Sequence, residues 1–145
     1  QKRGIVFDVG HGGGSFIFEQ AIPAVKQGLK PDVISTDLHT GSMNGGMKNI
    51  NNVMSKFLNM GLSIQELIAA TTSKPAKYIQ RNDLGHLSVG GVADVTLLKI
   101  KEGNFGFIDT RGKRMEGNQK LECELTLKGG KVVYDLNGLA SIYWK

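Results

Sequence analysis

The sequence predicts an α/β protein built in two unequal parts. Up to about residue 82, short apolar runs alternate with segments whose apolar residues recur at helical spacing, which favours parallel strands joined by crossover helices. Beyond residue 83 the apolar period changes to two and glycines recur at short intervals, which is typical of β-strands and turns. We therefore divide the chain into residues 1–82 and residues 83–145.

The first part opens with two strand candidates separated by a helix. Residues 4–9 form a short apolar run that ends in the glycine-rich segment 10–14, and residues 32–36 form a second buried run. Between them, residues 16–29 carry helical apolar spacing. Pro23 fits this helix only if the helix begins near residue 18 or later, since a residue of the first turn needs no N–H partner.

Three further helices follow in the first part. Residues 47–58 form a methionine-rich apolar stripe that ends at Gly61, and this stripe predicts core packing rather than a binding face. Ser63 and Glu66 have the spacing of a capping box, which marks the start of the next helix. Pro75 suits the first turn of a last, short helix that runs to about residue 80.

The second part reads as β-structure. Residues 93–100 show little alternation, which predicts a strand covered on both faces. Residues 121–128 alternate strictly, so one face should be buried and the other should meet water, and Gly129-Gly130 should turn the chain into a hairpin. The buried positions are Leu121, Cys123, Leu125 and Leu127, and the opposite positions are Glu122, Glu124, Thr126 and Lys128.

Composition narrows the classes of protein that this chain can belong to. It has 145 residues, 40% of them hydrophobic and 21% charged, as in an ordinary soluble domain, and no apolar run of membrane-spanning length or signal peptide is visible. We expect a cytoplasmic location by default. Cys123 is the single cysteine, so it cannot form an internal disulfide, and we expect it to act as a small apolar filler.

The net charge of +5 raises the question of nucleic-acid binding. The basic residues are scattered, and only residues 111–114 form a cluster, without aromatic residues between them. We interpret this cluster as a solvated loop and do not expect a nucleic-acid partner, although binding with a steep salt dependence would reverse that interpretation.

Polar residues and glycines follow both predicted strands at their C-terminal ends. Asp37 and His39 follow the second strand, and His11 with Gly12 and Gly13 follows the first. Strand ends that open into glycine loops suggest one shared pocket, in which backbone N–H groups could approach an anionic group of a ligand. Each residue also has a plainer interpretation: Asp37 as a turn cap, His11 as an exposed loop residue and His39 as a loop tie.

Other polar residues are predicted to serve structure. His86 and Asp94 belong to the passage into the β-region, and Ser42 should satisfy backbone groups rather than line a pocket. Asp8 lies within the first strand, where a buried carboxylate needs a partner, so an ion pair and a chemical role are equally open for it.

Several motifs resemble the amidohydrolase superfamily of metal-dependent hydrolases. Residues 34–39 (Ile-Ser-Thr-Asp-Leu-His) resemble the last barrel strand of that family, with its metal-site aspartate. Residues 72–76 and 85–95 resemble the helix after the barrel and the strand that re-enters a small β-sandwich. Residues 7–16 and 115–117 are similar to the dihydroorotase-like branch, which includes deacetylases.

The resemblance covers nearly the whole chain but only the last part of such an enzyme. It implies the last two strand–helix units of a (β/α)8 barrel in residues 1–82 and the C-terminal part of a β-sandwich in residues 83–145, since a complete barrel takes about 250 residues. The family's His-x-His pair is absent, and the three histidines of this chain match none of the family's metal-ligand histidines.

The resemblance also implies an activity, which is hydrolysis of an amide, N-acyl or cyclic amide C–N bond with one or two divalent metal ions, usually zinc. Asp37 would be the catalytic residue and metal ligand, and His11, His39, Gly12 and Gly13 would contact substrate. We expect the isolated chain to be inactive and to require the remainder of the barrel or a second copy to cover its exposed strand edges. The alternative is a non-catalytic α/β module, for interaction or ligand binding, derived from such an enzyme.

Overall fold

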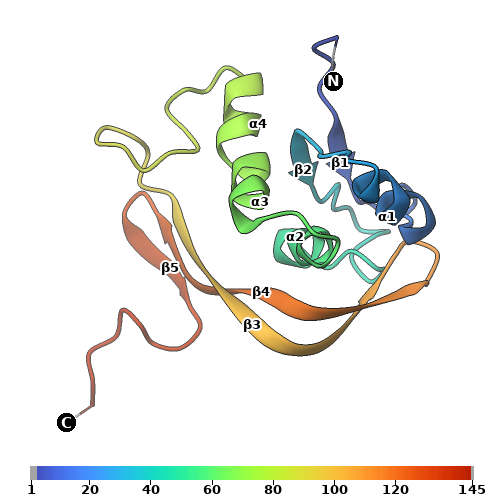
Figure 1. Ribbon diagram of the computed structural model, residues 1–145. Coiled ribbons are helices and arrows are strands. Elements are labelled where there is room, and N and C mark those ends of the chain that lie inside the picture. The colour runs from blue at the N-terminus through green and yellow to red at the C-terminus, as the bar shows by residue number, and fades with distance from the viewer. Residues whose placement is uncertain (1–2, 145) are drawn as a thin grey trace.

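Within residues 3–144, which the computed structural model describes, the chain forms two sheets and four α-helices (Figure 1). The first sheet is the parallel pair β1 (Asp8–Gly10) and β2 (Val33–Ser35), in which Asp8 lies opposite Val33. Helix α1 (Phe18–Lys26) connects the two strands as a crossover. The predicted strand–helix–strand unit is therefore present, with strands shorter than the apolar runs suggested.

Pro23 departs from the sequence prediction. The helix does begin at Phe18, but Pro23 lies six residues in, in the second turn rather than the first. A proline at that position has no N–H for the carbonyl four residues earlier. Helix α1 continues only to Lys26, so the missing bond affects a short helix near its end.

Helices α2 (Ile50–Asn59), α3 (Ile64–Thr71) and α4 (Ser73–Tyr78) follow the second strand. The start of α2 is set by Asn49, whose side chain accepts a hydrogen bond of 2.9 Å from the backbone N–H of Asn52. The capping box at α3 is confirmed, since Ser63 and Glu66 each accept a backbone N–H of the other residue. Pro75 occupies the first turn of α4, as predicted.

The second sheet is a long, curved antiparallel hairpin with a short third strand. It comprises β3 (Val95–Ile108), β4 (Arg114–Lys128) and β5 (Lys131–Asp135) in the order β3-β4-β5. The hairpin passes beneath α2, and the turn at Gly129-Gly130 joins β4 to β5 as predicted (Figure 1). The core draws on α1, α2, α3 and β2, and this sheet contributes Phe107 and Leu121 to it.

Methionines of the apolar stripe do belong to that core, because Met47 and Met54 are buried among phenylalanine, leucine and valine side chains. The core comprises Phe16, Phe18, Ile34, Met47, Val53, Met54, Phe57, Leu62, Leu67, Ala70, Phe107 and Leu121.

Two β-region predictions are wrong. Strand β3 is not covered on both faces, because Leu97 is 47% exposed and Ile100 is 42% exposed. Glu124 does not face water but is only 8% exposed. The strand register explains Glu124: Leu97 pairs with Leu125 and Leu98 pairs with Cys123, so Glu124 is the extra residue of a β-bulge and its side chain is redirected.

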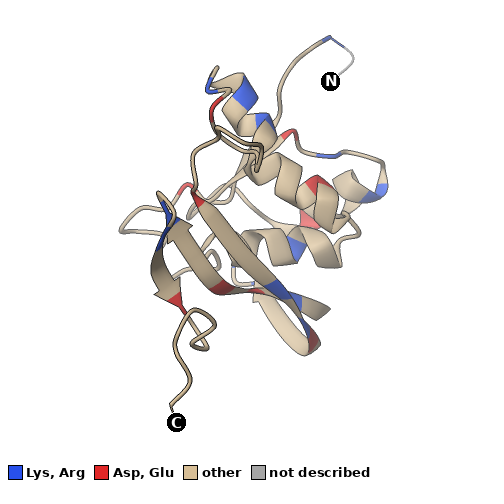
Figure 2. Ribbon diagram, turned by 90° about the vertical axis from the view of Figure 1, so that its left-hand side faces the viewer, with Lys and Arg blue, Asp and Glu red and all other residues tan. Residues whose placement is uncertain are grey.

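No helix in residues 3–144 combines the length and the apolar character that crossing a lipid bilayer requires. Lys and Arg residues are spread over helices, loops and the hairpin (Figure 2). The basic cluster at residues 111–114 forms the turn between β3 and β4 and the first residue of β4, where Arg114 pairs with Glu116 at 2.8 Å.

Candidate functional site

The C-terminal ends of β1 and β2 bring the two predicted loops side by side. The backbone N–H of His11 donates to the Ser35 carbonyl at 3.4 Å, and that of Gly12 donates to the Thr36 carbonyl at 2.9 Å. These bonds hold the two segments together past Gly10 and Ser35, the last pair of the parallel ladder. The predicted meeting of the two strand ends is therefore found.

Asp37 lies where the second strand ends, exposed and in an unusual backbone conformation. Its φ is 48°, in the left-handed region that aspartate tolerates better than most residues. A Cβ added to Gly12, which has φ +51°, would lie 2.5 Å from Asp37 Oδ2. The Asp37 carboxylate thus lies against Gly12, and the left-handed backbone of that residue favours glycine.

His39 lies on the exposed side of the same loop. Its Nδ1 accepts a hydrogen bond of 3.1 Å from the Gly41 N–H, and its own backbone N–H donates to Ser42 Oγ at 3.0 Å. His39 Nε2 lies 3.6 Å from the place that a Cβ on Gly13 would take. The structure therefore gathers Gly12, Gly13, Asp37 and His39 at one end of the parallel pair.

The plainer predictions for neighbouring polar residues agree with their contacts. Ser42 is buried and bonds the backbone of residues 37 and 39. His86 bonds the Asn82 carbonyl, and Asp94 accepts the Gly129 N–H. Asp8 differs from its prediction, because it is exposed rather than buried and its partner is a hydroxyl, not a cation: it accepts a hydrogen bond of 3.2 Å from Ser35 Oγ.

His11 points away from this end, into the protein. Its side chain is 0% exposed, its Nδ1 lies 3.0 Å from the Gly12 carbonyl and its Nε2 lies 2.7 Å from Lys56 Nζ. The ring also stacks on Phe16 with centroids 4.6 Å apart. Burial lowers the pKa of His11, and the Lys56 charge lowers it further, against a raising effect of the Gly12 carbonyl. Substrate contact by His11 stays a prediction, and here both ring nitrogens face protein partners.

Lys56, on α2, is the buried partner of His11, and the sequence analysis missed it. Its side chain is 0% exposed. Burial lowers the pKa of Lys56 to about 8, although the nearby Asp109 carboxylate acts in the opposite direction. Helical spacing in the sequence could have indicated its burial. Lys56 lies three residues after Val53 and four before Met60, and therefore on the apolar side of the helix.

Asp109, in the turn after β3, was missed as well. Its Oδ2 accepts the N–H of Phe18, the first residue of α1, at 3.0 Å, and its Oδ1 accepts the N–H groups of Arg111 and Lys113. Burial opposes its ionisation, but these three backbone donors and Lys56 outweigh burial and hold the pKa of Asp109 below its ordinary value. The hairpin end is therefore fixed to the start of α1 by one carboxylate.

Among residues 3–144, no three His, Cys, Asp or Glu side chains come together as a group that could hold a metal ion. Asp37 is a chemically suitable oxygen ligand, but a stable site for zinc needs three or four ligands. The described part of the chain therefore does not supply a complete metal site.

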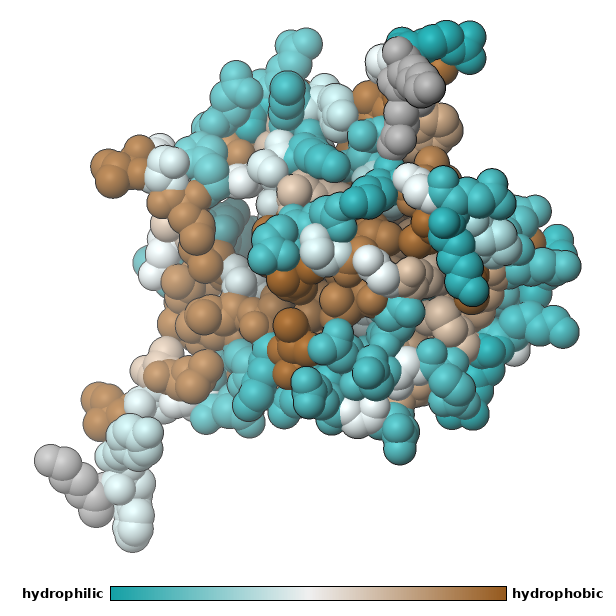
Figure 3. Space-filling model, viewed as in Figure 1, coloured by the Kyte–Doolittle hydropathy of each residue, from teal (hydrophilic) through white to brown (hydrophobic). Residues whose placement is uncertain are grey.

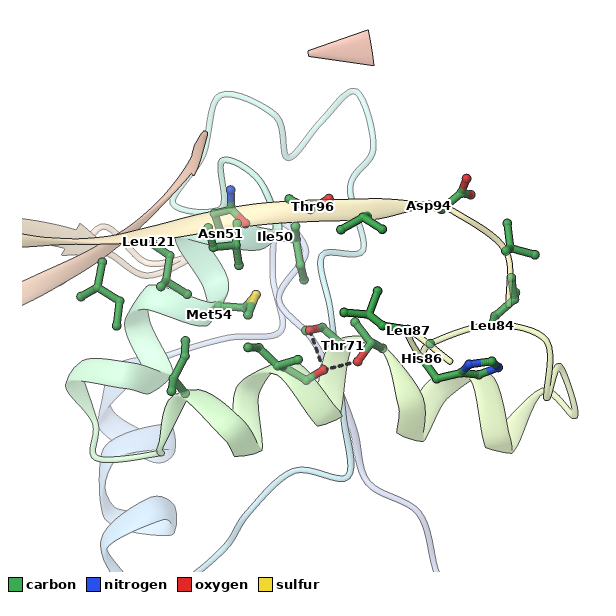
Figure 4. A pocket seen from close by; sticks show the side chains of 18 residues that line it. Ile50, Asn51, Met54, Thr71, Leu84, His86, Leu87, Asp94, Thr96 and Leu121 are labelled. Atoms are coloured by element: carbon green, nitrogen blue, oxygen red, sulfur yellow. Dashed lines mark hydrogen bonds between the residues drawn. The ribbon is translucent and has the colours of Figure 1, made fainter. Parts of the chain in front are cut away.

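A groove of the surface lies elsewhere, between α2, α3 and β3. It has a volume of about 520 Å³ and a mostly apolar lining. In Figure 4, Met54 and Leu121 lie toward one end, while His86 and Leu87 lie toward the other. Brown, hydrophobic surface surrounds this region in Figure 3. Because the His86 and Asp94 groups at its rim already have backbone partners, this groove resembles a surface to be covered rather than a reaction site.

Similarity to known proteins shows which family this chain belongs to. A sequence model of the amidohydrolase family matches residues 20–134. A deacetylase from Brucella anthropi is 35% identical over 131 residues, which are 90% of this chain and 33% of that protein. A crystal structure of an adenine deaminase superposes with a TM-score of 0.87 at 31% identity, and one of a dihydroorotase with a TM-score of 0.83 at 32% identity.

The chain spans about a third of these proteins, since the alignments cover 37% of the adenine deaminase and 36% of the dihydroorotase but 93% and 91% of this chain. The family match covers well over half of the sequence and includes Asp37, His39 and the whole β3–β4 hairpin. The chain therefore belongs to the amidohydrolase family.

Proposed function

We propose that this chain is the C-terminal portion of a metal-dependent amidohydrolase that cleaves an amide, N-acyl or cyclic amide C–N bond. The observation that carries the proposal is the exposed Asp37 carboxylate at a parallel strand end, where it lies against Gly12. Relatives described as a deacetylase and a dihydroorotase support this class of bond.

Asp37 would act as the general acid–base group. A carboxylate at this position can accept a proton from an attacking water and deliver it to the leaving nitrogen, a role worth about 10²- to 10⁴-fold in rate. His39 and the N–H groups of Gly12 and Gly13 would orient the substrate from the loops beside it. We propose Asp37 also as the one ligand that this chain contributes to a divalent metal site, with zinc as the expected ion.

The same proposal gives each part of the chain a place in the complete protein. The parallel pair with its helices would be the last two strand–helix units of a barrel, residues 1–82, and the β3-β4-β5 sheet would be part of a β-sandwich, residues 83–145. The remainder of the enzyme would then cover the apolar groove and the open edges of both sheets. The coverage of only about a third of each relative supports this assignment.

The test is a comparison of two carboxylates in the complete protein. We expect Asp37→Asn to lower kcat for hydrolysis of N-acyl amino acids or cyclic amides by about 100-fold or more. The control is Asp83→Asn, which makes the same chemical change at a remote carboxylate paired with Arg81. Equal activity of both variants would refute the role of Asp37.

A second experiment on the proposed function uses the isolated chain and measures its metal content and its hydrolytic activity in the same assay. We expect no stoichiometric metal and no turnover, because the ligand set of the described residues is incomplete. Tight zinc with turnover by residues 1–145 alone would contradict the proposal. The incomplete ligand set also leaves a second candidate, a non-catalytic binding module, and a monomeric chain that folds cooperatively and has no longer form would favour it.

A further inference from the structure

The ammonium group of Lys56 is surrounded by acceptors that match its donors in number. Lys56 Nζ lies 2.7 Å from His11 Nε2, 2.9 Å from the Gly46 carbonyl and 2.8 Å from the Ile108 carbonyl. A protonated lysine has three N–H donors and no acceptor, so all three bonds form at once. The Phe16 and Phe18 rings, with centroids 5.8 and 6.0 Å away, enclose the charge.

These bonds fix the state of His11. Because Lys56 donates to Nε2, that nitrogen carries no proton, and the single ring proton resides on Nδ1. Nδ1 then donates to the Gly12 carbonyl 3.0 Å away. A doubly protonated ring would direct an N–H at the Lys56 ammonium, which the buried position makes strongly unfavourable.

A continuous set of contacts therefore leads from α2 to the exposed carboxylate. Lys56 holds the His11 ring, the ring holds the Gly12 carbonyl, and Gly12 in turn bonds the Thr36 carbonyl and lies against Asp37 Oδ2. Lys56 binds at the same time the loop after β2, through Gly46, and the end of β3, through Ile108. One side chain thus joins three segments that surround the loops.

We propose that Lys56 and His11 are positioning residues that hold the Gly12 loop, and through it the Asp37 carboxylate, in the geometry needed for reaction. This inference rests on the proposed function for its kinetic consequence, but not for the hydrogen-bond pattern itself. Both side chains are buried, so in this proposal they act through Gly12, and this role replaces the substrate contact predicted for His11 from the sequence.

The kinetic test uses two His11 variants that separate the two contacts of the ring. In His11→Gln, an acceptor for Lys56 remains near the place of Nε2, but the donor to the Gly12 carbonyl is lost. In His11→Asn, a donor to the Gly12 carbonyl remains near the place of Nδ1, but the hydrogen bond with Lys56 is lost. In the complete protein we expect each to lower kcat about 10- to 100-fold, with KM and metal content unchanged, because small displacements of a reacting group are costly. His86→Gln, at a remote histidine, should leave kcat unchanged.

A double variant distinguishes positioning from general stability. If His11 acts through Asp37, Asp37→Asn with His11→Gln should be no slower than Asp37→Asn alone. Additive losses, or full activity of both His11 variants in a protein that Asp37→Asn inactivates, would overturn the inference and leave the proposed function intact. An active Asp37→Asn variant would instead refute the proposed function.

Nuclear magnetic resonance of the complete protein, labelled with 15N-histidine, tests the pattern without any assay and without any variant having to fold well. We expect the His11 signals to show the neutral ring with its proton on Nδ1 across pH 6 to 7.5. A ring protonated on Nε2, or one that gains a second proton near the ordinary pKa of about 6.5, would overturn the inference.

Discussion

At the residue scale, Gly12 combines a left-handed backbone with a close approach to the Asp37 carboxylate. Two constraints coincide at Gly12: its φ of +51° and the 2.5 Å that would separate an added Cβ from Asp37 Oδ2. The neighbouring Gly14 has neither constraint, because its φ is not positive and open space surrounds the position of a Cβ. The glycine loop therefore contains one position that favours glycine and one that offers a matched control.

Gly12→Ala should reduce both stability and activity. The left-handed backbone costs an alanine about 1–2 kcal/mol, and the new methyl group displaces the carboxylate. Gly14→Ala should leave both quantities unchanged within experimental error. Chemical denaturation of each variant, with kcat measured in the complete protein, checks the pair, and an active, fully stable Gly12→Ala would show that the loop adapts without cost.

Lys56 should give the free energy of unfolding an alkaline pH dependence. Its pKa is lowered to about 8 in the folded protein, by burial first and by Lys48, against the attraction of Asp109, while the unfolded value is 10.5. Between these two pH values the unfolded chain binds more protons, so stability rises with pH there and the Lys56 contribution is constant below about pH 8. The full effect is about 3 kcal/mol at most.

The measurement is the free energy of unfolding at pH 7.5 and pH 9.5. Lys56→Met should remove the rise, and Lys77→Met, at an exposed lysine of α4, should preserve it. If the free energy of unfolding rose equally with pH in the unmodified protein, Lys56→Met and Lys77→Met, groups other than Lys56 would be responsible.

The candidate site residues at the strand ends could be predicted from the sequence, but the roles of the buried residues behind them could not. Asp37 and His39 could be found because a strand followed by a polar glycine loop is a local pattern. Lys56 and Asp109 could not be assigned roles in this way, since their partners lie 45 and 91 positions away in the chain. His11 was found, but its burial depends on Lys56 and was therefore not foreseen.

At the element scale, helix ends were predictable because their determinants are local. Gly61 and the Ser63 capping box lie next to the ends that they define, and both are found. Strand environments were not predictable in the same way. The bulge that buries Glu124 results from the register between β3 and β4, which no alternation within β4 can reveal.

Ser63→Ala should destabilise the chain by about 1 kcal/mol, because it leaves the Glu66 N–H at the start of α3 without its acceptor. Gln65→Ala is the control, since Gln65 is an exposed residue of the same turn and alanine favours helices. Thermal or denaturant unfolding compares the two. Equal stability of both variants would mean that α3 is held by packing alone.

At the scale of the whole molecule, apolar surface remains uncovered over a large area. Ile5, Val6 and Phe7 are exposed before β1, and the groove between α3 and β3 is open (Figure 3). Residues after β5 add nearly fully exposed side chains, namely Ile142, Tyr143 and Trp144. Patches of this kind mark surfaces that associate with another chain or segment.

The isolated chain should therefore self-associate. We expect analytical ultracentrifugation to show concentration-dependent oligomers, and we expect the same chain joined to the remainder of the proposed enzyme to lose this association. A monomer at all concentrations that binds no hydrophobic dye would contradict the expectation that the apolar surface needs a cover.

The position of Ile108 and Asp109 in the chain has a consequence for the order of synthesis. Asp37 leaves the ribosome long before the hairpin end does, yet the Lys56 ammonium lacks its Ile108 acceptor, and α1 lacks the Asp109 carboxylate, until that end has emerged and docked. Contacts of such long sequence separation carry a large entropic cost of loop closure, which slows folding. A nascent or truncated chain that stops before residue 108 would thus contain every loop residue of the candidate site but lack the contacts of Ile108 and Asp109. We expect such shortened chains to be unable to acquire activity.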